Sequence, residues 1–259
     1  MKLLLAVSLM LGAGLRSADA EPATVRVLAD QAVLVHRVTK SVCMVLIGAE
    51  TPVHVQDISH STEQLVRLSR DLDTRADVSK ALLADVDTLI KSARQIAAGD
   101  LHTVPLTLIL RINPDLADAF DQMKVDAPST ISAKNRGSFM LVQDLRVVSQ
   151  AFQRDLCLAL TGLAPDGANE VLARQIAFFA VSMDRLVTGR AKDGLVAAPN
   201  IHIKITLGKV AGKWKTLEPI LSAAAAGQPI DPRDAQLASV LGDAILKNLD
   251  DITDRFLAL

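Results

Sequence analysis

The stretch HRVTKSVCMVLIG, residues 36–48, organises the rest of the chain, because it returns as QAFQRDLCLALTG at residues 150–162. Both cysteines of the chain, Cys43 and Cys157, fall at the same place in the two copies, 114 residues apart. The same offset, without a gap, pairs a closing glycine and three apolar positions: Gly48 with Gly162, Ile58 with Leu172, Leu65 with Phe179 and Leu72 with Leu186. The sequence therefore predicts one module present twice.

The first twenty residues have the three parts of a secretory signal peptide. Lys2 is followed by the apolar run LLLAVSLMLGAGL, and Ala18-Asp19-Ala20 is typical of a cleavage site. The run is too short for a membrane anchor, and no other stretch reaches the roughly 18 apolar residues that spanning requires. We expect residues 1–20 to be removed and the mature chain to be periplasmic, soluble and without a membrane span.

The composition of the mature chain favours an all-helical protein. It has 26 basic and 28 acidic residues, and this near balance argues against a nucleic-acid partner. Aromatic residues are scarce, with one Trp and no Tyr, while Ala, Leu, Val and Asp recur at helical spacing. We therefore expect helices packed around an aliphatic core.

Each copy of the module is predicted to contain four helices. In the first copy they cover about 22–48, 53–72, 78–98 and 107–123, the last interrupted at Asn113-Pro114. In the second copy they cover about 139–162, 169–186, 202–226 and 232–257, with Asp231-Pro232 as a helix start. The alternation of Ile201, Ile203 and Ile205 would by itself indicate a strand, but its neighbourhood and its counterpart favour a helix.

These elements predict four segments: a signal peptide at 1–20, a first repeat at 21–124, a linker at 125–138 and a second repeat at 139–259. The linker VDAPSTISAKNRGS is rich in Pro, Ser and Gly and lacks a clear period. Four helices with short connections predict an up-down bundle in each repeat. The expected fold is all-α, two tandem four-helix bundles forming a pseudo-dimer, and we expect the chain to be a monomer because it supplies both halves.

The cysteines add a geometric prediction. Eleven residues advance a helix only about 20° beyond three turns, so Ala32 shares a face with Cys43, and Arg146 shares the equivalent face with Cys157. A pseudo-twofold axis between these two helices would bring the cysteines together. An even number of cysteines in an exported chain favours a Cys43–Cys157 disulfide. The alternative is two buried free thiols that act as small hydrophobic groups.

The first helix of each copy also carries a family resemblance. The segments VRVLADQAVLVHRVTK (25–40) and FMLVQDLRVVSQAFQR (139–154) resemble the pattern INxAGRQRMLSQRMAK. This pattern opens the N-terminal sensor domain of type IV pilus methyl-accepting chemotaxis receptors, which is related to the periplasmic domain of nitrate/nitrite sensor kinases. The closest match to RMLSQ is residues 146–150, RVVSQ, and the resemblance covers most of both copies. It implies a helical bundle that senses a small ligand.

The resemblance implies ligand-binding residues by position. An arginine of the motif binds the anion in the nitrate sensors, and it corresponds to Arg146 here, with Gln150 in the same RVVSQ segment and Arg37 at the later motif arginine. A guanidinium suits an oxyanion because it offers a planar fork of donors. The copies differ, since Ala32 stands in the place of Arg146 and Ala151 in that of Arg37, while Lys40 and Arg154 both match the closing lysine. The alternative is that Arg146 and Arg37 are solvated or salt-bridged helix residues.

No catalytic or metal motif accompanies these residues. The histidines at 36, 54, 60, 102 and 202 form no metal-binding spacing, since His54 and His60 are six residues apart. The segment GKVAGK at 208–213 is one residue short of a phosphate loop and is followed by Trp214. The carboxylates at 71, 73, 250 and 251 are expected to be solvated, and no nucleophile signature is present. We expect no enzyme activity, no cofactor and no metal.

Two functions remain from the sequence. The first is a free-standing periplasmic sensory protein that binds a small anion and reports it to a membrane-bound kinase or chemoreceptor. The second is a structural or protein-interaction module of the cell envelope without small-ligand binding. Retention of residues 146–150, RVVSQ, favours the first, and asymmetric loss of the motif arginines favours the second.

Overall fold

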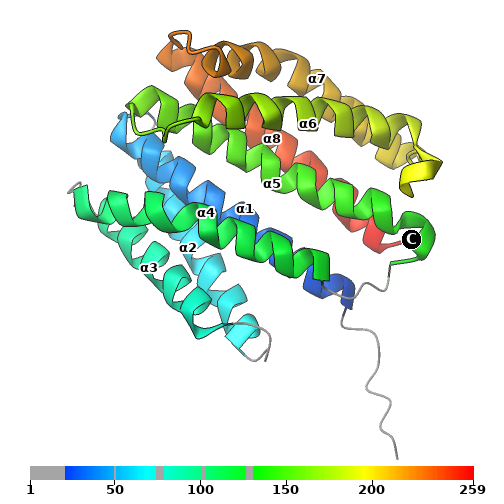
Figure 1. Cartoon of the computed structure of the whole chain (residues 1–259), viewed down its shortest axis with the longest axis horizontal. Helices are drawn as coiled ribbons and strands as arrows, with labels where there is room; N and C mark the ends of the chain where they lie inside the picture. Colours follow the sequence, from blue (N-terminus) through cyan, green and yellow to red (C-terminus); the bar gives the residue numbers. More distant parts are fainter. Residues whose placement is uncertain (1–20, 50, 74–78, 101–102, 127–130) are drawn as a thin grey trace, which may run out of the picture.

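The computed structural model describes residues 21–49, 51–73, 79–100, 103–126 and 131–259. Over these ranges the protein is all-helical, as predicted, with eight α-helices, one short 3-10 helix and no β-strand. The α-helices are α1 (Glu21–Leu46), α2 (Thr51–Asp73), α3 (Lys80–Ala97), α4 (Thr103–Asp126), α5 (Ala133–Thr161), α6 (Ala168–Thr188), α7 (Ile201–Ala225) and α8 (Pro232–Leu257) (Figure 1). The predicted signal peptide, 1–20, lies outside the described residues.

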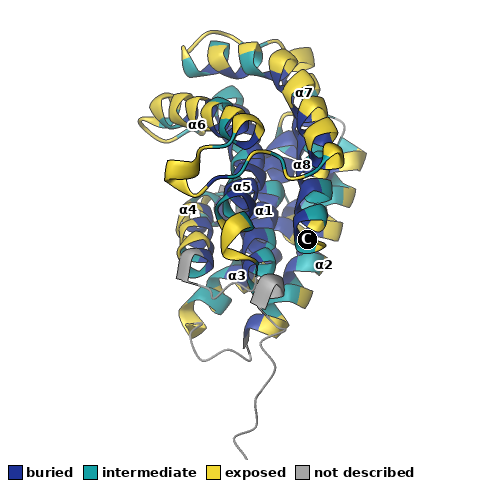
Figure 2. Ribbon diagram, turned by 90° about the vertical axis from the view of Figure 1, so that its right-hand side faces the viewer, coloured by how far each residue is buried: buried dark blue, intermediate teal, exposed yellow. Residues whose placement is uncertain are grey.

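The two central helices are α1 and α5, whose positions are buried over most of their length (Figure 2). α1 packs against α2, α3 and α4, whereas α5 packs against α6, α7 and α8. In Figure 1 the helices α1–α4 lie on one side of the molecule and α5–α8 on the other. α1 and α5 also pack along each other, so the first helices of the two copies face one another.

The apolar positions that the repeat aligns are buried in the same way in both copies. Each of the six residues concerned is at most 2% exposed, and together they are Ile58, Leu65, Leu72, Leu172, Phe179 and Leu186. A core position that faces inward in one copy therefore faces inward in the other. Burial of these side chains removes apolar surface from water, which is the main favourable contribution to folding.

The ends of several helices follow from local chemistry that the sequence shows. Asp231 is the N-cap of α8 and accepts a bond from the Arg233 amide, as predicted. Asn200 caps α7 in the same way by accepting from the Ile203 amide, which explains why the alternating isoleucines form a helix. Gly162 ends α5 in the left-handed conformation that residues with a Cβ disfavour.

Two predicted boundaries are wrong. Helix α4 continues through Pro114, because Asn113 is fixed from outside the helix: its Nδ2 donates to the Val35 carbonyl at 3.0 Å and to Thr39 Oγ1 at 2.7 Å. Helix α5 begins at Ala133, inside the range 125–138 that was predicted as a linker. Its first turns are held by Ser138, whose hydroxyl donates to the Val196 carbonyl and accepts from the Val196 amide, each at 3.0 Å.

Among the helices described above, none is both long enough and apolar enough to span a membrane.

Candidate functional site

The contact between α1 and α5 contains the two cysteines. Cys43 and Cys157 are paired in a disulfide with a Cα–Cα distance of 6.1 Å, and both residues are buried. The geometric prediction that the cysteines meet between the two first helices is therefore confirmed. We call this contact the seam, defined by α1, α5 and the residues that bridge them.

Buried polar side chains lie along the seam, and two equivalent residues, Lys40 and Arg154, make comparable bonds across it. Lys40 of α1 is 1% exposed, and its Nζ donates to both carboxylate oxygens of Asp243 on α8 at 2.8 Å. Its counterpart Arg154 on α5 donates to Asn113 Oδ1 on α4 at 2.6 Å. Each closing basic residue of the first-helix motif thus binds the last helix of the opposite copy.

His36 adds a second partner for Arg154. Arg154 Nη1 lies 2.9 Å from His36 Nδ1, and because a guanidinium can only donate, Nδ1 accepts and the imidazole is neutral. Burial and the Arg154 charge together hold the pKa of His36 well below its usual range. A charged imidazole is therefore disfavoured at this position.

Arg146, the predicted ligand residue, is engaged by protein groups on every side. Its residue exposure is only 4%. Nε donates to Asp250 Oδ1 at 2.7 Å, Nη1 donates to Gln143 Oε1 at 2.7 Å, and Nη2 forms an ion pair with Asp30. The structure thus agrees with the alternative of a salt-bridged helix residue. Asp250 is also not simply solvated, as the sequence led us to expect, but joins α8 to α5.

These charges depend on one another. Burial disfavours the charged form of Arg146, but Asp30 and Asp250 outweigh this effect and raise its pKa. Burial also raises the pKa of Asp250, and the guanidinium of Arg146 opposes the shift only in part. Removing the carboxylates would leave the charge of Arg146 in a poorly solvated place.

An equivalent arrangement in the other copy uses a different cation. Asp144 is the repeat counterpart of Asp30. Asp121 of α4 is the second carboxylate of this cluster, as Asp250 of α8 is in the cluster around Arg146. Lys124 of α4, 1% exposed, forms ion pairs with both of these carboxylates. Because Ala32 replaces the arginine on α1, the neutralising charge comes from α4 instead. The first copy therefore lacks the arginine of the motif, and Lys124 neutralises the carboxylates of this cluster in place of that arginine.

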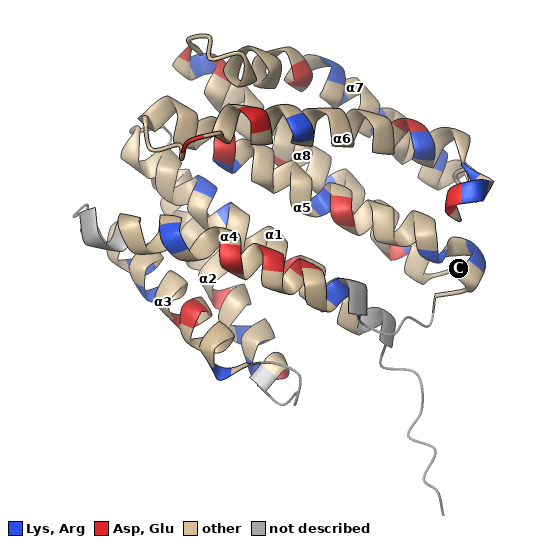
Figure 3. Ribbon diagram, viewed as in Figure 1, with Lys and Arg blue, Asp and Glu red and all other residues tan. Residues whose placement is uncertain are grey.

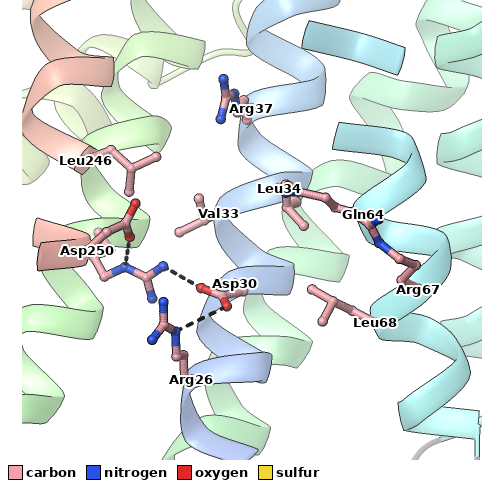
Figure 4. A pocket seen from close by; sticks show the side chains of 11 residues that line it. Arg26, Asp30, Val33, Leu34, Arg37, Gln64, Arg67, Leu68, Leu246 and Asp250 are labelled. Atoms are coloured by element: carbon pink, nitrogen blue, oxygen red, sulfur yellow. Dashed lines mark hydrogen bonds and ion pairs between the residues drawn. The ribbon is translucent and has the colours of Figure 1, made fainter. Parts of the chain in front are cut away.

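Arg146 and Arg37 line one concave surface, which we call the arginine groove. It has a volume of about 350 Å³ and is formed by α1, α2, α5 and α8 (Figure 4). Its lining consists of four arginines, two aspartates, one glutamine and four aliphatic residues: Arg26, Arg37, Arg67, Arg146, Asp30, Asp250, Gln64, Val33, Leu34, Leu68 and Leu246. Figure 4 shows Arg26 and Arg37 toward opposite ends of the groove, with Val33 and Leu34 between them.

The arginines of the groove differ in how far they are already neutralised. Arg26 pairs with Asp30 and Asp254, and Arg37 Nη2 donates to Asp57 at 3.0 Å. Arg37 Nε is buried and has no partner among the described residues. Arg67 is exposed and makes no ion pair within the part of the chain that the structure describes.

The third predicted ligand residue, Gln150, does not line this groove. It is fully buried in the seam, and its Nε2 lies 3.4 Å from Asp243 Oδ1. The structure thus brings together Arg146 and Arg37 but separates Gln150 from them. The sequence reasoning missed Arg67, Arg26 and Asp30. The repetition of Asp30 as Asp144 was a signal that could have indicated the paired carboxylates.

No group of three or more His, Cys, Asp or Glu side chains that could hold a metal ion occurs in the described ranges. Comparison of the chain with protein-family models, with curated proteins and with solved structures found no match.

Proposed function

We propose that this chain is a free-standing periplasmic ligand-binding protein of the sensory type, and that it binds a small anion in the arginine groove. The observation that carries the proposal is the groove itself, where Arg67 is free of carboxylates and Arg37 has an unpartnered buried Nε. Both groups are donors, and planar guanidinium groups suit small oxyanions such as nitrate. The resemblance to nitrate-sensing domains points in the same direction.

Within this proposal Arg146 is a positioning residue and does not contact the ligand. Its donors are already bound to Asp30, Gln143 and Asp250, so an anion would have to displace a carboxylate to reach it. Arg146 binds these two carboxylates and partly cancels their negative charge. The groove therefore repels an anion less than it would without Arg146. The anion would contact Arg67 and Arg37, with Arg26 at the far end.

The proposed architecture is two tandem up-down four-helix bundles that form a pseudo-dimer within one chain. This is supported by the packing of α1 on α2–α4, of α5 on α6–α8, and of α1 on α5. The disulfide and the reciprocal bonds of Lys40 and Arg154 across the seam also support it. We propose a monomer that reports ligand binding to a membrane-bound kinase or chemoreceptor, with no nucleic-acid partner.

One observation favours a second candidate function. The complete engagement of Arg146 is what a structural or protein-interaction module of the envelope would retain after losing ligand binding. Such a module would use the buried ion pairs to fix the seam and would bind no small anion.

A thermal-shift titration of the mature protein with nitrate, nitrite and small carboxylates distinguishes the two. A ligand at about 100 times its Kd stabilises a protein by about 2.7 kcal/mol, which is a visible shift in Tm. Arg67→Ala should abolish the shift. The matched control is Arg70→Ala, which removes the same charge from an exposed position of the same helix outside the groove. No shift with any anion, or an equal loss in both variants, would rule out the anion site.

A further inference from the structure

A second groove lies on the other side of the seam from the arginine groove. It is formed mainly by α4, α5 and α6, with a volume of about 690 Å³, the size of a small-molecule pocket. Its apolar lining includes Val147, Val148, Ala151, Val171, Pro165 and Phe178. We call it the apolar groove. The ring of Phe178 has no core to cover it, since this residue is 39% exposed.

This groove is the repeat counterpart of the arginine groove. Val147 and Val148 occupy the places that Val33 and Leu34 have in the first copy, and Asp144 that of Asp30. Three polar residues of the arginine groove have apolar counterparts here. Ala151 stands at the position of Arg37, Phe178 at that of Gln64 and Val181 at that of Arg67. Duplication therefore produced two equivalent grooves that differ in charge and polarity.

The lining of the apolar groove is acidic among its charged residues. Four carboxylates line it, namely Asp118, Asp121, Asp144 and Asp155, against a single cationic lining residue, Arg154. Arg154 is paired with Asp155, and Lys124 neutralises Asp121 and Asp144 only in part because it carries one charge for two carboxylates. Asp118 makes no ion pair with any described residue. Figure 3 shows acidic positions following one another along α4.

The partly buried side chain of Gln175 supplies an independent sign of an absent donor. Gln175 lines the apolar groove, and its Nε2 donates to Asp155 Oδ2 at 2.9 Å. This bond directs the amide, and its Oε1 is buried without a hydrogen-bond partner among the described residues. A buried acceptor left unsatisfied is costly, so a donor that enters the groove would be favoured there.

We propose that the apolar groove binds a small organic ammonium ion with an aliphatic tail. The ammonium group would lie beside the Phe178 ring and the unpartnered Gln175 Oε1, which are three positions apart on α6. A cation–π contact and the attraction of the lining carboxylates, Asp118 among them, would act together there. The tail would lie along Val147, Val148 and Val171. This proposal is independent of the anion site, because it rests on other residues in the other copy.

The test is calorimetric titration of the mature protein with hexylammonium, and with hexanoate as a probe of equal length and opposite charge. Hexylammonium should bind once per chain, and hexanoate should neither bind in this groove nor compete. Asp118→Asn should weaken hexylammonium binding about threefold, in keeping with a partly solvated ion pair. Phe178→Gln, which installs the residue of the arginine groove, should weaken it about tenfold because both the apolar contact and the cation–π contact are lost.

Both substitutions are at exposed positions and leave the core intact. The matched control is Asp115→Asn, which removes an exposed carboxylate of α4 outside the groove. It should change the affinity less than about twofold, because interactions between solvent-exposed charges are weak. The proposal is overturned if hexylammonium does not bind, if either groove variant binds it like the natural protein, or if hexanoate competes. Nα-acetyl-lysine methylamide serves as a model of a protein lysine. If it binds more tightly than hexylammonium, the small-molecule proposal is overturned and the ligand is a lysine side chain of a protein partner.

Discussion

Arg146 places a guanidinium where almost none of it reaches solvent, and two carboxylates and an amide bind it there. A buried ion pair often contributes no more to folding stability than apolar side chains of equal volume would. Removing only one of its partners, however, lowers the stability strongly. This asymmetry makes the role of Arg146 measurable, because a ligand residue and a positioning residue respond differently to truncation.

Arg146→Ala should lower the free energy of unfolding by about 2 kcal/mol, because Asp30 and Asp250 lose their buried cation. The loss is moderated because Arg26 still pairs with Asp30 and the two carboxylate side chains are 27% and 39% exposed. Arg146→Lys should recover part of the loss, as Lys124 neutralises the equivalent carboxylates in the other copy. The measurement is urea unfolding at neutral pH. The control Arg67→Ala should change stability by less than about 0.5 kcal/mol, since its side chain is exposed and unpaired. A stable Arg146→Ala protein would contradict the positioning role.

His36 should make the protein less stable in mild acid. Burial and Arg154 depress its pKa in the folded protein, so the unfolded chain binds a proton there more readily than the folded one. Its contribution is therefore fully present above the unfolded value of about 6.5 and is lost as pH falls below it, by at most about 1.4 kcal/mol per pH unit. His36→Gln should lose this dependence. Unfolding curves of both proteins between pH 7.5 and about 5 test this, and parallel profiles would show that His36 does not titrate as inferred.

At the scale of single residues the sequence could indicate positions but not partners. The resemblance led to Arg146 and Arg37, and both do line one groove. It also led to Gln150, but this residue is buried in the seam, with its Nε2 3.4 Å from Asp243 Oδ1. The sequence could not exclude Gln150 from the site, because helix phase alone does not say which neighbouring helix covers a face. The pairing of Arg146 with Asp250 joins residues 104 positions apart, and no local pattern encodes it.

At the scale of elements, the predicted helices largely agree with the structure because apolar spacing and capping residues are local signals. The exceptions have tertiary causes. α4 continues through Pro114 because Asn113 is bonded to α1 and α5, which a local rule for proline cannot anticipate. α5 extends to Ala133 because its first turns pack under the 190–196 segment through Ser138.

Gly137 tests this packing of the early turns of α5. A Cβ at this position would lie 2.5 Å from the Gly194 carbonyl oxygen, a backbone atom that cannot move aside easily. Gly137→Ala should therefore destabilise the protein by about 1–2 kcal/mol, although alanine is the better helix former. The control is Gly208→Ala in α7, where no atom lies within 4 Å, and it should stabilise by about 0.5–1 kcal/mol. Equal stabilisation of both variants in thermal unfolding would contradict the observed contact.

At the scale of the whole molecule, the seam between α1 and α5 is the feature around which the buried polar contacts and both grooves are arranged. The disulfide, the reciprocal bonds of Lys40 and Arg154, and the two buried cations Arg146 and Lys124 all lie on or beside it. The two grooves flank it, one rich in arginine and one largely apolar with four lining carboxylates. The sequence predicts the repeat, but the difference between the two grooves could be seen only from the packing, since it depends on which helices meet.

The disulfide makes the seam testable in solution. In the chain-entropy description, closing a loop of 114 residues stabilises a protein by about 4–5 kcal/mol. Reduction, or the double substitution Cys43→Ser with Cys157→Ser, should therefore lower the midpoint of urea unfolding markedly.

The most direct measurement is a count of free thiols in the denatured and unreduced protein, followed by mass spectrometry of its peptides. If the two first helices meet at the seam, no free thiol is found, and one cross-linked peptide pair contains Cys43 and Cys157. Two reactive thiols per chain would contradict the seam, and with it the pairing of the two copies on which both grooves depend.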